Sequence, residues 1–206
     1  RVGALLIFDE ITIGWRMHTG GVHLKYGVMP DLAVFAKALG NGHPIAAVIG
    51  TAAAMSGAHG SFISSTYWTE SVGFVAALAT LRKLNTVDVP GHVARLGRRV
   101  QQCWIDSARR YALPVRVGGY PCLAHFRFDH PQADALRTLY TQEMLALGFL
   151  AGAGLYPTWA HTDAIVDRYA EAIDRVFFEV SQALARGDVV SRLRGPVAHS
   201  GFKRLL

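Results

Sequence analysis

Two short strand-like segments near the start of this 206-residue chain each lead into a charged side chain. The first, residues 2–8, is continuously apolar and too short for a helix, and Asp9 follows it at once. The second, residues 31–36, leads into Lys37. Because continuously apolar strands are typical of sheets covered on both faces, we interpret residues 2–8 as a fully buried strand of an α/β fold. The sequence therefore predicts an acid and an amine at the ends of two strands.

These two groups suit the chemistry of pyridoxal 5'-phosphate (PLP). A carboxylate keeps the pyridine nitrogen of this cofactor protonated, which makes the ring an electron sink. A lysine amine forms a Schiff base with its aldehyde and carries protons as general acid and base. Ala36 and Ala38 flank Lys37 and predict an apolar, desolvated amine. From these residues alone, a capping or salt-bridged Asp9 and a surface Lys37 are the structural alternatives.

Several further segments resemble the class III aminotransferases, and most of all their glutamate-1-semialdehyde aminomutase branch. They are residues 6–11, 14–16, 30–32, 65–71 and 160–162, together with Lys37. The resemblance implies a PLP-dependent transferase of fold type I, the aspartate aminotransferase-like fold. On this basis residues 1–88 are the carboxyl-terminal part of the PLP-binding large domain. Residues 89–112 are a linking helix, and residues 113–206 are a small α+β domain with a tail.

The resemblance also implies roles for individual residues. Lys37 would carry the Schiff base and Asp9 would face the pyridine nitrogen. Ile11 would lie against the ring, and Thr66, with Ser65 as a weaker candidate, would reach the phosphate of a neighbouring subunit's cofactor. A homodimer with a shared active site follows from that arrangement. The structural alternatives are a core position for Ile11 and an ordinary capping turn for residues 65 and 66.

Members of this family are roughly twice as long as this chain. Their first half carries the loop that holds the PLP phosphate and the aromatic ring that stacks on the cofactor. We therefore expect a carboxyl-terminal half whose amino-terminal half is missing. The leading hypothesis is an aminotransferase or aminomutase acting on an amino acid, a semialdehyde or a related amine, with a small-molecule amino donor or acceptor. The alternative is a catalytically incomplete fragment, or a non-catalytic interaction subunit of the same fold.

Composition excludes several other classes of protein. With 51% hydrophobic and 17% charged residues the chain is globular, and no apolar run reaches the ~18 residues of a membrane span. The net charge of +6 comes from basic residues spread along the chain without a nucleic-acid motif, so we expect no nucleic-acid partner. Cys103 and Cys122 form no C-x-x-C pair, which favours free thiols and a cytoplasmic location.

Four other features of the sequence bear on its chemistry. The turn at residues 40–44 lacks the last glycine of a dinucleotide fingerprint. The histidines at positions 18, 23, 43 and 59 follow no ligand spacing, so we expect no metal. Glu10 is open to two interpretations, a hydrogen bond or ion pair that supports the turn after the first strand, or a catalytic role. Arg16, His125 and Arg127 are candidate contacts for a substrate carboxylate, with surface or structural roles as the alternative.

Periodicity predicts the remaining elements. Strands are expected at residues 45–50, 115–118, 122–128 and 149–150. Helices are expected at 69–85, capped by Thr69, and at 90–111, 132–147 and 162–186, with a helical turn at 51–56. Residues 187–206 are expected to form a basic surface tail.

Overall fold

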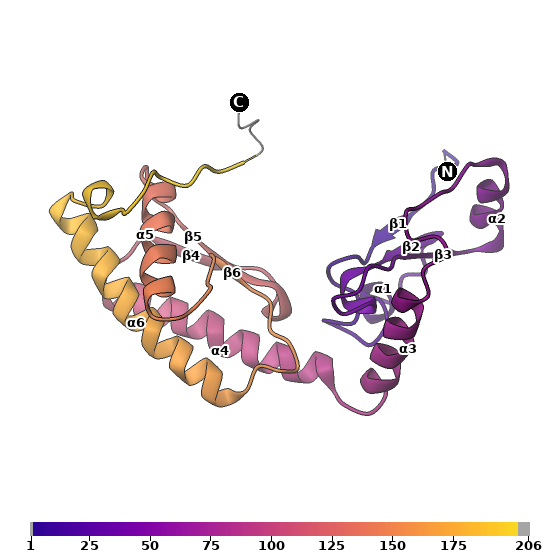
Figure 1. Cartoon of the computed structure of the whole chain (residues 1–206), viewed down its shortest axis with the longest axis horizontal. Helices are drawn as coiled ribbons and strands as arrows, with labels where there is room; N and C mark the ends of the chain where they lie inside the picture. Colours follow the sequence, from indigo (N-terminus) through magenta and orange to yellow (C-terminus); the bar gives the residue numbers. More distant parts are fainter. Residues whose placement is uncertain (1, 202–206) are drawn as a thin grey trace. The chain divides into compact units, whose positions relative to one another are not determined.

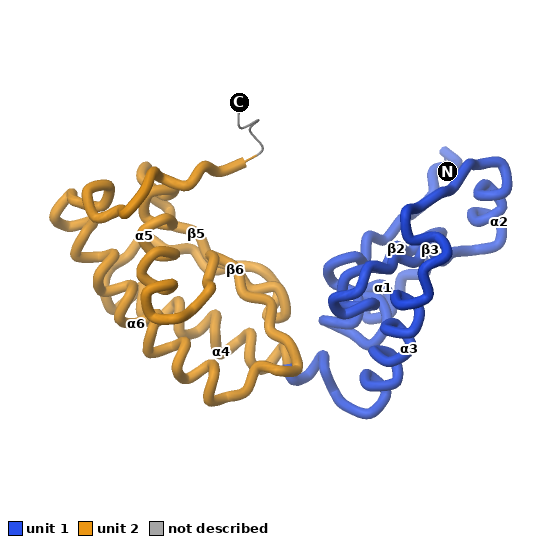
Figure 2. Tube along the Cα trace, viewed as in Figure 1, with its two compact units in different colours: residues 1–92 blue, residues 93–206 orange. Residues whose placement is uncertain are grey.

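The structure, a computed structural model, describes residues 2–201. It divides into two compact units, residues 1–92 and residues 93–206, called unit 1 and unit 2 below (Figures 1 and 2). The boundary lies inside helix α4 (Val89–Arg110), and the buried side chains of this helix from Val93 onward belong to unit 2.

Unit 1 is built on a three-stranded mixed sheet in the order β1-β2-β3 (Figure 1). Strand β1 (Ile7–Asp9) runs parallel to β2 (Leu32–Phe35), with Asp9 opposite Val34. Strand β3 (Ala47–Gly50) pairs with β2 in the antiparallel sense. The two strands expected on either side of Lys37 are thus confirmed.

Helices and 3-10 turns connect and follow the three strands of unit 1. They are α1 (Val22–Lys25), the 3-10 turn η1 (Lys37–Leu39), α2 (Ala52–Met55), the 3-10 turn η2 (Ser56–Gly60) and α3 (Val72–Leu84). Thr51 caps α2 by accepting a hydrogen bond from the Ala54 amide. Helix α3 begins at Val72, three residues later than expected, because the Glu70 carboxylate accepts from the Val72 amide at 3.0 Å. The expected cap at Thr69 is wrong.

The core of unit 1 is small. Its buried hydrophobic cluster contains Ala33, Phe35, Leu39 and Ala77. The prediction of a fully buried strand at residues 2–8 is wrong, since the strand begins at Ile7 and this side chain is 55% exposed. An apolar run is buried only if another layer covers it. Within residues 2–201, β1 pairs with β2 along one edge and with no strand along the other.

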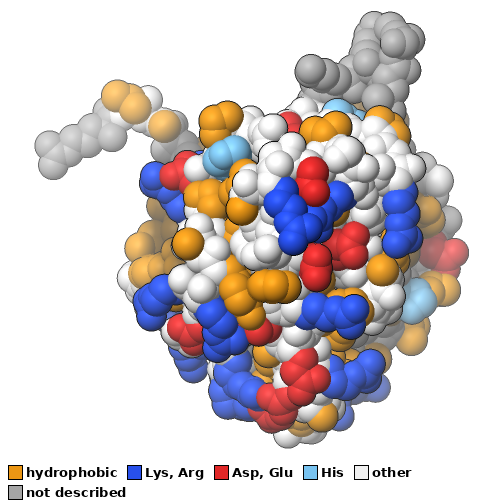
Figure 3. Space-filling view, turned by 90° about the vertical axis from the view of Figure 1, so that its left-hand side faces the viewer, with side chains coloured by type: hydrophobic (Ala, Val, Ile, Leu, Met, Phe, Trp, Pro, Cys, Tyr) orange, Lys and Arg blue, Asp and Glu red, His pale blue; other side chains and the backbone are white. Residues whose placement is uncertain are grey.

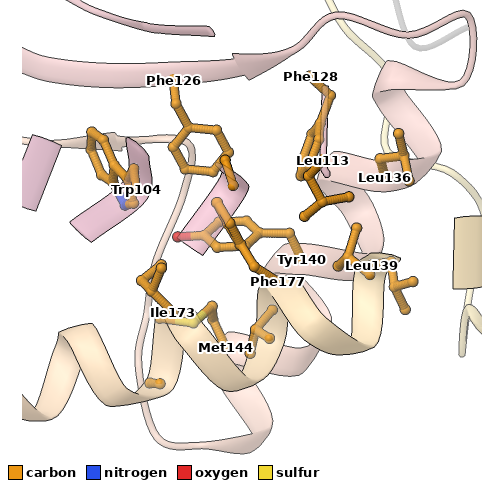
Figure 4. Packing of buried hydrophobic residues seen from close by; sticks show 14 of the residues in the cluster. Trp104, Leu113, Phe126, Phe128, Leu136, Leu139, Tyr140, Met144, Ile173 and Phe177 are labelled. Carbon is orange, nitrogen blue, oxygen red and sulfur yellow. The ribbon is translucent and has the colours of Figure 1, made fainter. Parts of the chain in front are cut away.

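Unit 2 contains a second sheet, antiparallel and in the order β4-β5-β6. Its strands are β4 (Val115–Gly118), β5 (Ala124–Phe128) and β6 (Gly154–Leu155), and the 3-10 turn η3 (Pro121–Leu123) precedes β5. Alternate residues of β5, namely Ala124, Phe126 and Phe128, are buried. They pack with helix α4, helix α5 (Ala133–Ala146) and helix α6 (Asp163–Arg186) into one large core (Figure 4).

The polar atoms inside this core are hydrogen-bonded to one another. The indole of Trp104 donates to the Tyr169 hydroxyl at 3.0 Å, and that hydroxyl lies 3.3 Å from the Tyr140 hydroxyl. Tyr140 in turn donates to the Gly152 carbonyl at 3.3 Å. Burial raises the pKa of Tyr140 to about 12, so this hydroxyl is a neutral donor at ordinary pH.

Two expectations for unit 2 need correction. The expected strand at residues 149–150 is wrong, and β6 lies at Gly154–Leu155. Leu150 is 96% exposed, so its apolar character did not mark a buried strand. The tail expected from residue 187 contains a 3-10 turn, η4 (Val190–Arg192), and then runs along α5. There Gln142 accepts from the Arg194 amide at 2.7 Å and Thr138 accepts from the Ala198 amide at 3.0 Å. Residues 202–206 of the expected tail lie outside the described residues.

Charged side chains join α4 and α6 on the surface of unit 2. Arg95 donates two hydrogen bonds to Asp163, at 2.6 and 3.1 Å, and Arg99 bonds both Asp163 and Asp167. The Arg95 guanidinium lowers the pKa of Asp163. On the face of the molecule in Figure 3, Lys and Arg side chains lie among Asp and Glu side chains.

In the described part of the chain, no helix combines the length and apolarity needed to cross a bilayer.

Candidate active site

Asp9 and Lys37 lie at one edge of the unit 1 sheet. Asp9 is the last residue of β1, and Lys37 follows shortly after the end of β2. Because the two strands are parallel and Asp9 is opposite Val34, both residues stand at the carboxyl ends of their strands. This is the edge at which open α/β sheets bind ligands.

Asp9 is oriented by its own backbone. Its Oδ1 accepts a hydrogen bond from the Ile11 amide at 3.0 Å, a local turn that aspartate commonly forms. Its Oδ2 makes no hydrogen bond within residues 2–201. The carboxylate is exposed and retains acceptor capacity for a ligand. Ile11, the residue expected against a cofactor ring, is half-buried directly after this turn.

Lys37 has a different environment from the one its alanine neighbours predicted. Its side chain is exposed, because the chain turns out of the sheet into η1 at this residue. The φ angle of Lys37 is +45°, a left-handed conformation that is uncommon outside glycine and often found at functional sites. The Nζ atom donates a hydrogen bond to the Thr12 hydroxyl at 2.7 Å. In the part of the chain that the structure describes, this amine is exposed, so the expectation that it would be buried is wrong.

The chain after Lys37 is confined to a tight turn. A Cβ on Gly40 would collide with the His43 carbonyl oxygen and would lie 2.7 Å from Ile45 Cγ2. Asn41 and Gly42 both have positive φ angles, 46° and 107°. This part of the backbone requires small or left-handed residues, which is consistent with the glycine-rich sequence at 40–44.

Glu10 has a structural environment. It is 1% exposed, and its carboxylate accepts from the Val22 amide at 2.8 Å and the His23 amide at 3.0 Å. The His23 ring is also buried, with Nδ1 2.9 Å from Glu10 Oε1. Of the two interpretations of Glu10, the structure shows the supporting hydrogen bonds. Residues 2–201 contain no cluster of His, Cys, Asp or Glu able to hold a metal.

The other candidate residues lie elsewhere. Thr66 and Ser65 are exposed in the loop before α3, where Ser65 accepts from the Tyr67 amide at 3.2 Å. The structure does not bring either hydroxyl to Asp9 or Lys37, and their contact with a phosphate stays a prediction. Arg16 is in the loop after β1, and His125 and Arg127 are on β5 of unit 2.

Two residues of this region were not found from the sequence. Thr12 contacts Lys37 directly, and His23 completes the surroundings of Glu10. No local pattern marks either one, since both contacts depend on the path of the loop between β1 and α1. The one available signal was the position of Thr12, three residues beyond Asp9 and next to Ile11, which was expected in the site.

Comparison with known proteins gives a consistent picture. The family described as "Aminotransferase class-III" matches residues 1–177. The 2'-deamino-2'-hydroxyneamine transaminase of Streptomyces kanamyceticus is 31% identical, over 83% of this chain and 45% of its own length. A glutamate-1-semialdehyde 2,1-aminomutase of Clostridium beijerinckii is 36% identical, over 84% of this chain and 44% of its own length.

A solved structure agrees with these relatives. The FumI protein of Sphingopyxis sp. MTA144, determined with PLP, superposes with a TM-score of 0.81 at 25% identity. The match covers 89% of this chain and 45% of that one. The chain thus spans less than half the length of the relatives it matches.

Proposed function

The chain belongs to the class-III aminotransferases, and from this membership we propose that it supplies the lysine-bearing part of a PLP-dependent aminotransferase or aminomutase. Its relatives include enzymes named as transaminases and as aminomutases, and its α/β fold is that of the PLP-dependent fold type I transaminases, as the sequence predicted. The observation that carries the proposal is the placement of Asp9 and Lys37 together at the carboxyl edge of parallel strands.

The residues at this edge fit the cofactor chemically. PLP, when bound, supplies an electron sink for the carbanion formed at the substrate carbon. Asp9 Oδ2 would accept a hydrogen bond from the pyridine N–H, while Oδ1 stays bonded to the Ile11 amide. Lys37 would hold the cofactor through its amine, a condensation with the aldehyde that releases one water. When the amine is free again, its Nζ would carry the proton that is moved at the substrate carbon. Ile11 would lie against the ring.

The proposal extends to the assembly of the site. Thr66, with Ser65 beside it, would bind the phosphate of a neighbouring subunit's cofactor, which requires a homodimer with shared active sites. Support for this comes from their exposure in a loop that leads into a helix. Substrates would be an amino acid, a semialdehyde or a related amine, with a second small molecule as amino donor or acceptor. We also propose a cytoplasmic location, and support for it comes from the two free thiols, Cys103 and Cys122.

An incomplete chain is the second candidate. Support for it comes from the apolar surface of unit 1, where Phe62, Phe74 and Val75 are 96%, 60% and 64% exposed. Surfaces of this kind mark contacts with another polypeptide. We propose that the rest of a class-III protein covers them and supplies the remaining contacts to PLP. Without that part, the chain would be a non-catalytic piece of the same fold.

The test is the visible absorption spectrum of the purified chain with PLP, before and after borohydride. A band near ~420 nm that borohydride fixes to Lys37 would support the catalytic assignment. Lys37→Ala should abolish this band, and Lys83→Ala, which removes a lysine from α3, should keep it. If the chain alone gives no band, the spectrum is repeated with the amino-terminal part of a class-III relative. Continued absence of the band would contradict the catalytic assignment.

A further inference from the structure

The hydrogen bond from Lys37 to Thr12 adds Thr12 to the residues of the candidate site. Thr12 is half-buried, and its hydroxyl accepts from Nζ at 2.7 Å. An exposed lysine otherwise samples many rotamers, and fixing it in one of them costs conformational entropy. A single acceptor on a held backbone restricts Nζ to the region beside the carboxyl ends of β1 and β2.

The backbone that carries Thr12 is held at both ends. The buried carboxylate of Glu10 binds the amides of Val22 and His23, and so closes the loop of residues 11–21. A Cβ on Gly21 would lie 2.8 Å from Glu10 Oε1 and would collide with the His23 ring, so this closure needs glycine there.

The middle of the loop is held as well. The Trp15 amide donates to the Gly20 carbonyl at 2.8 Å, and the Trp15 ring packs on Phe35 of β2 with ring centroids 4.8 Å apart. A Cβ on Gly14 would lie 2.8 Å from the Glu10 carbonyl oxygen. Thr12 thus lies on a loop that hydrogen bonds and packing hold, and its hydroxyl accepts the hydrogen bond from Lys37.

We propose that Thr12 is a positioning residue for Lys37: its hydroxyl keeps the amine at the edge shared with Asp9, ready to meet the aldehyde of a PLP molecule whose ring nitrogen faces Asp9. This inference rests on the proposed function, because it assumes that Lys37 is the reacting amine. The benefit is geometric, since a held amine reacts with a bound partner at a higher effective concentration than a freely moving one. An aldehyde that does not bind to the protein should react with Lys37 equally fast whether or not the amine is positioned.

The experiment compares two aldehydes on the same chain. PLP, which carries its own docking groups, and formaldehyde, which has none, are each added in limiting amount with borohydride. The amine adds to the aldehyde carbon, water leaves, and hydride reduces the carbon–nitrogen double bond. Peptide mass spectrometry then gives labelling at Lys37 relative to Lys25 and Lys83, which are internal references in the same chain.

Thr12→Val removes the hydroxyl at nearly constant volume, and Thr12→Ser keeps it. In the unaltered chain PLP should label Lys37 in preference to Lys25 and Lys83. Thr12→Val should reduce that preference about 3- to 10-fold, as expected for the loss of one hydrogen bond. Formaldehyde labelling of Lys37 should stay the same, and Thr12→Ser should restore the preference for PLP. Hydrogen-exchange mass spectrometry, read on peptides of unit 1, reports whether this unit stays folded.

The outcomes separate the two proposals. If PLP prefers Lys37 equally in the unaltered chain and in Thr12→Val, the positioning role is overturned and the role of Lys37 stands. If Thr12→Val changes labelling by both aldehydes alike, the effect is one of exposure or folding, and the positioning role is again overturned. If the unaltered chain shows no preference for Lys37, either alone or with the amino-terminal part of a class-III relative, the reacting role of Lys37 fails, and the role of Thr12 fails with it.

Discussion

The two units of this chain are stabilised in different ways. Unit 2 buries a large continuous core in which Trp104, Phe126, Tyr140 and Phe177 contact one another. Unit 1 has a small buried cluster, exposes large apolar side chains, and depends on one buried carboxylate, Glu10, to hold its longest loop. The unit with the candidate site is therefore the one with less core of its own. Its longest loop is closed by hydrogen bonds from two amides to the buried Glu10 carboxylate.

The largest expected effect tests the core of unit 2. Phe177 is fully buried against Phe126 and Tyr140, so Phe177→Ala should lower the free energy of unfolding of unit 2 by about 3–5 kcal/mol. Phe178 is the matched control, because it is 42% exposed and touches Tyr111 at its edge. Phe178→Ala should cost about 1 kcal/mol or less. Hydrogen-exchange mass spectrometry, read separately for peptides of each unit, measures both.

A loss of protection in unit 1 as large as that in unit 2 would contradict this contrast. It would mean that the two units unfold as one cooperative body.

The next effect tests unit 1. Glu10→Gln leaves buried N–H groups facing an amide that can accept at one atom only, and should destabilise unit 1 by about 1–3 kcal/mol. Glu70→Gln is the control, since Glu70 is exposed and bonds one amide at the start of α3. Exchange protection of residues 11–25 should fall in Glu10→Gln and persist in Glu70→Gln. Equal protection in both variants would show that the loop does not depend on Glu10.

A further expected effect concerns alkaline pH and unit 2 alone. Burial raises the pKa of Cys103 from 9.0 to about 12 and that of Tyr140 from 10.0 to about 12. Above pH 9 the unfolded chain loses protons that the folded chain keeps. The stability that these groups contribute is therefore fully present below pH 9 and is lost as pH rises toward 12. The free energy of unfolding falls by up to about 1.4 kcal/mol per pH unit for each group.

Urea unfolding followed by circular dichroism at several pH values between about 8 and 11 measures this slope. Cys103→Ala should make the slope shallower by removing one of the groups whose pKa burial raises, while Tyr140 and Tyr169 remain. A slope unchanged in Cys103→Ala would show that this thiol does not contribute.

Much of this arrangement could be predicted from local sequence. Apolar runs located β2, β3, β4 and β5, and periodicity located the four longer helices, because these signals come from neighbouring residues. The position of strand β6 was not predicted, because Gly154 and Leu155 are less apolar than Phe149 and Leu150. The pairing of β6 depends on backbone hydrogen bonds to β5, which no side-chain pattern marks. The exposure of residues 5–7 was not predicted, because a sequence pattern does not show whether another layer covers a strand.

The residues of the candidate site also fall into those that the sequence could predict and those that it could not. Asp9 and Lys37 could be selected because each directly follows a strand-like segment. The contacts of Thr12 and His23 could not, because they depend on how residues 11–21 close back on Glu10. Resemblance to a family supplied roles for Ile11, Ser65 and Thr66, and these roles stay predictions.

The pairing of strands has a consequence for the order in which the chain folds. In unit 2, β4 and β5 are joined by residues 119–123, so their antiparallel pairing closes a short loop. In unit 1, the parallel pairing of β1 with β2 must first close residues 10–31. Longer closure costs more chain entropy before any contact forms and slows folding. Refolding should therefore be biphasic, with β4–β5 protected early and the edge that carries Asp9 and Lys37 assembled last.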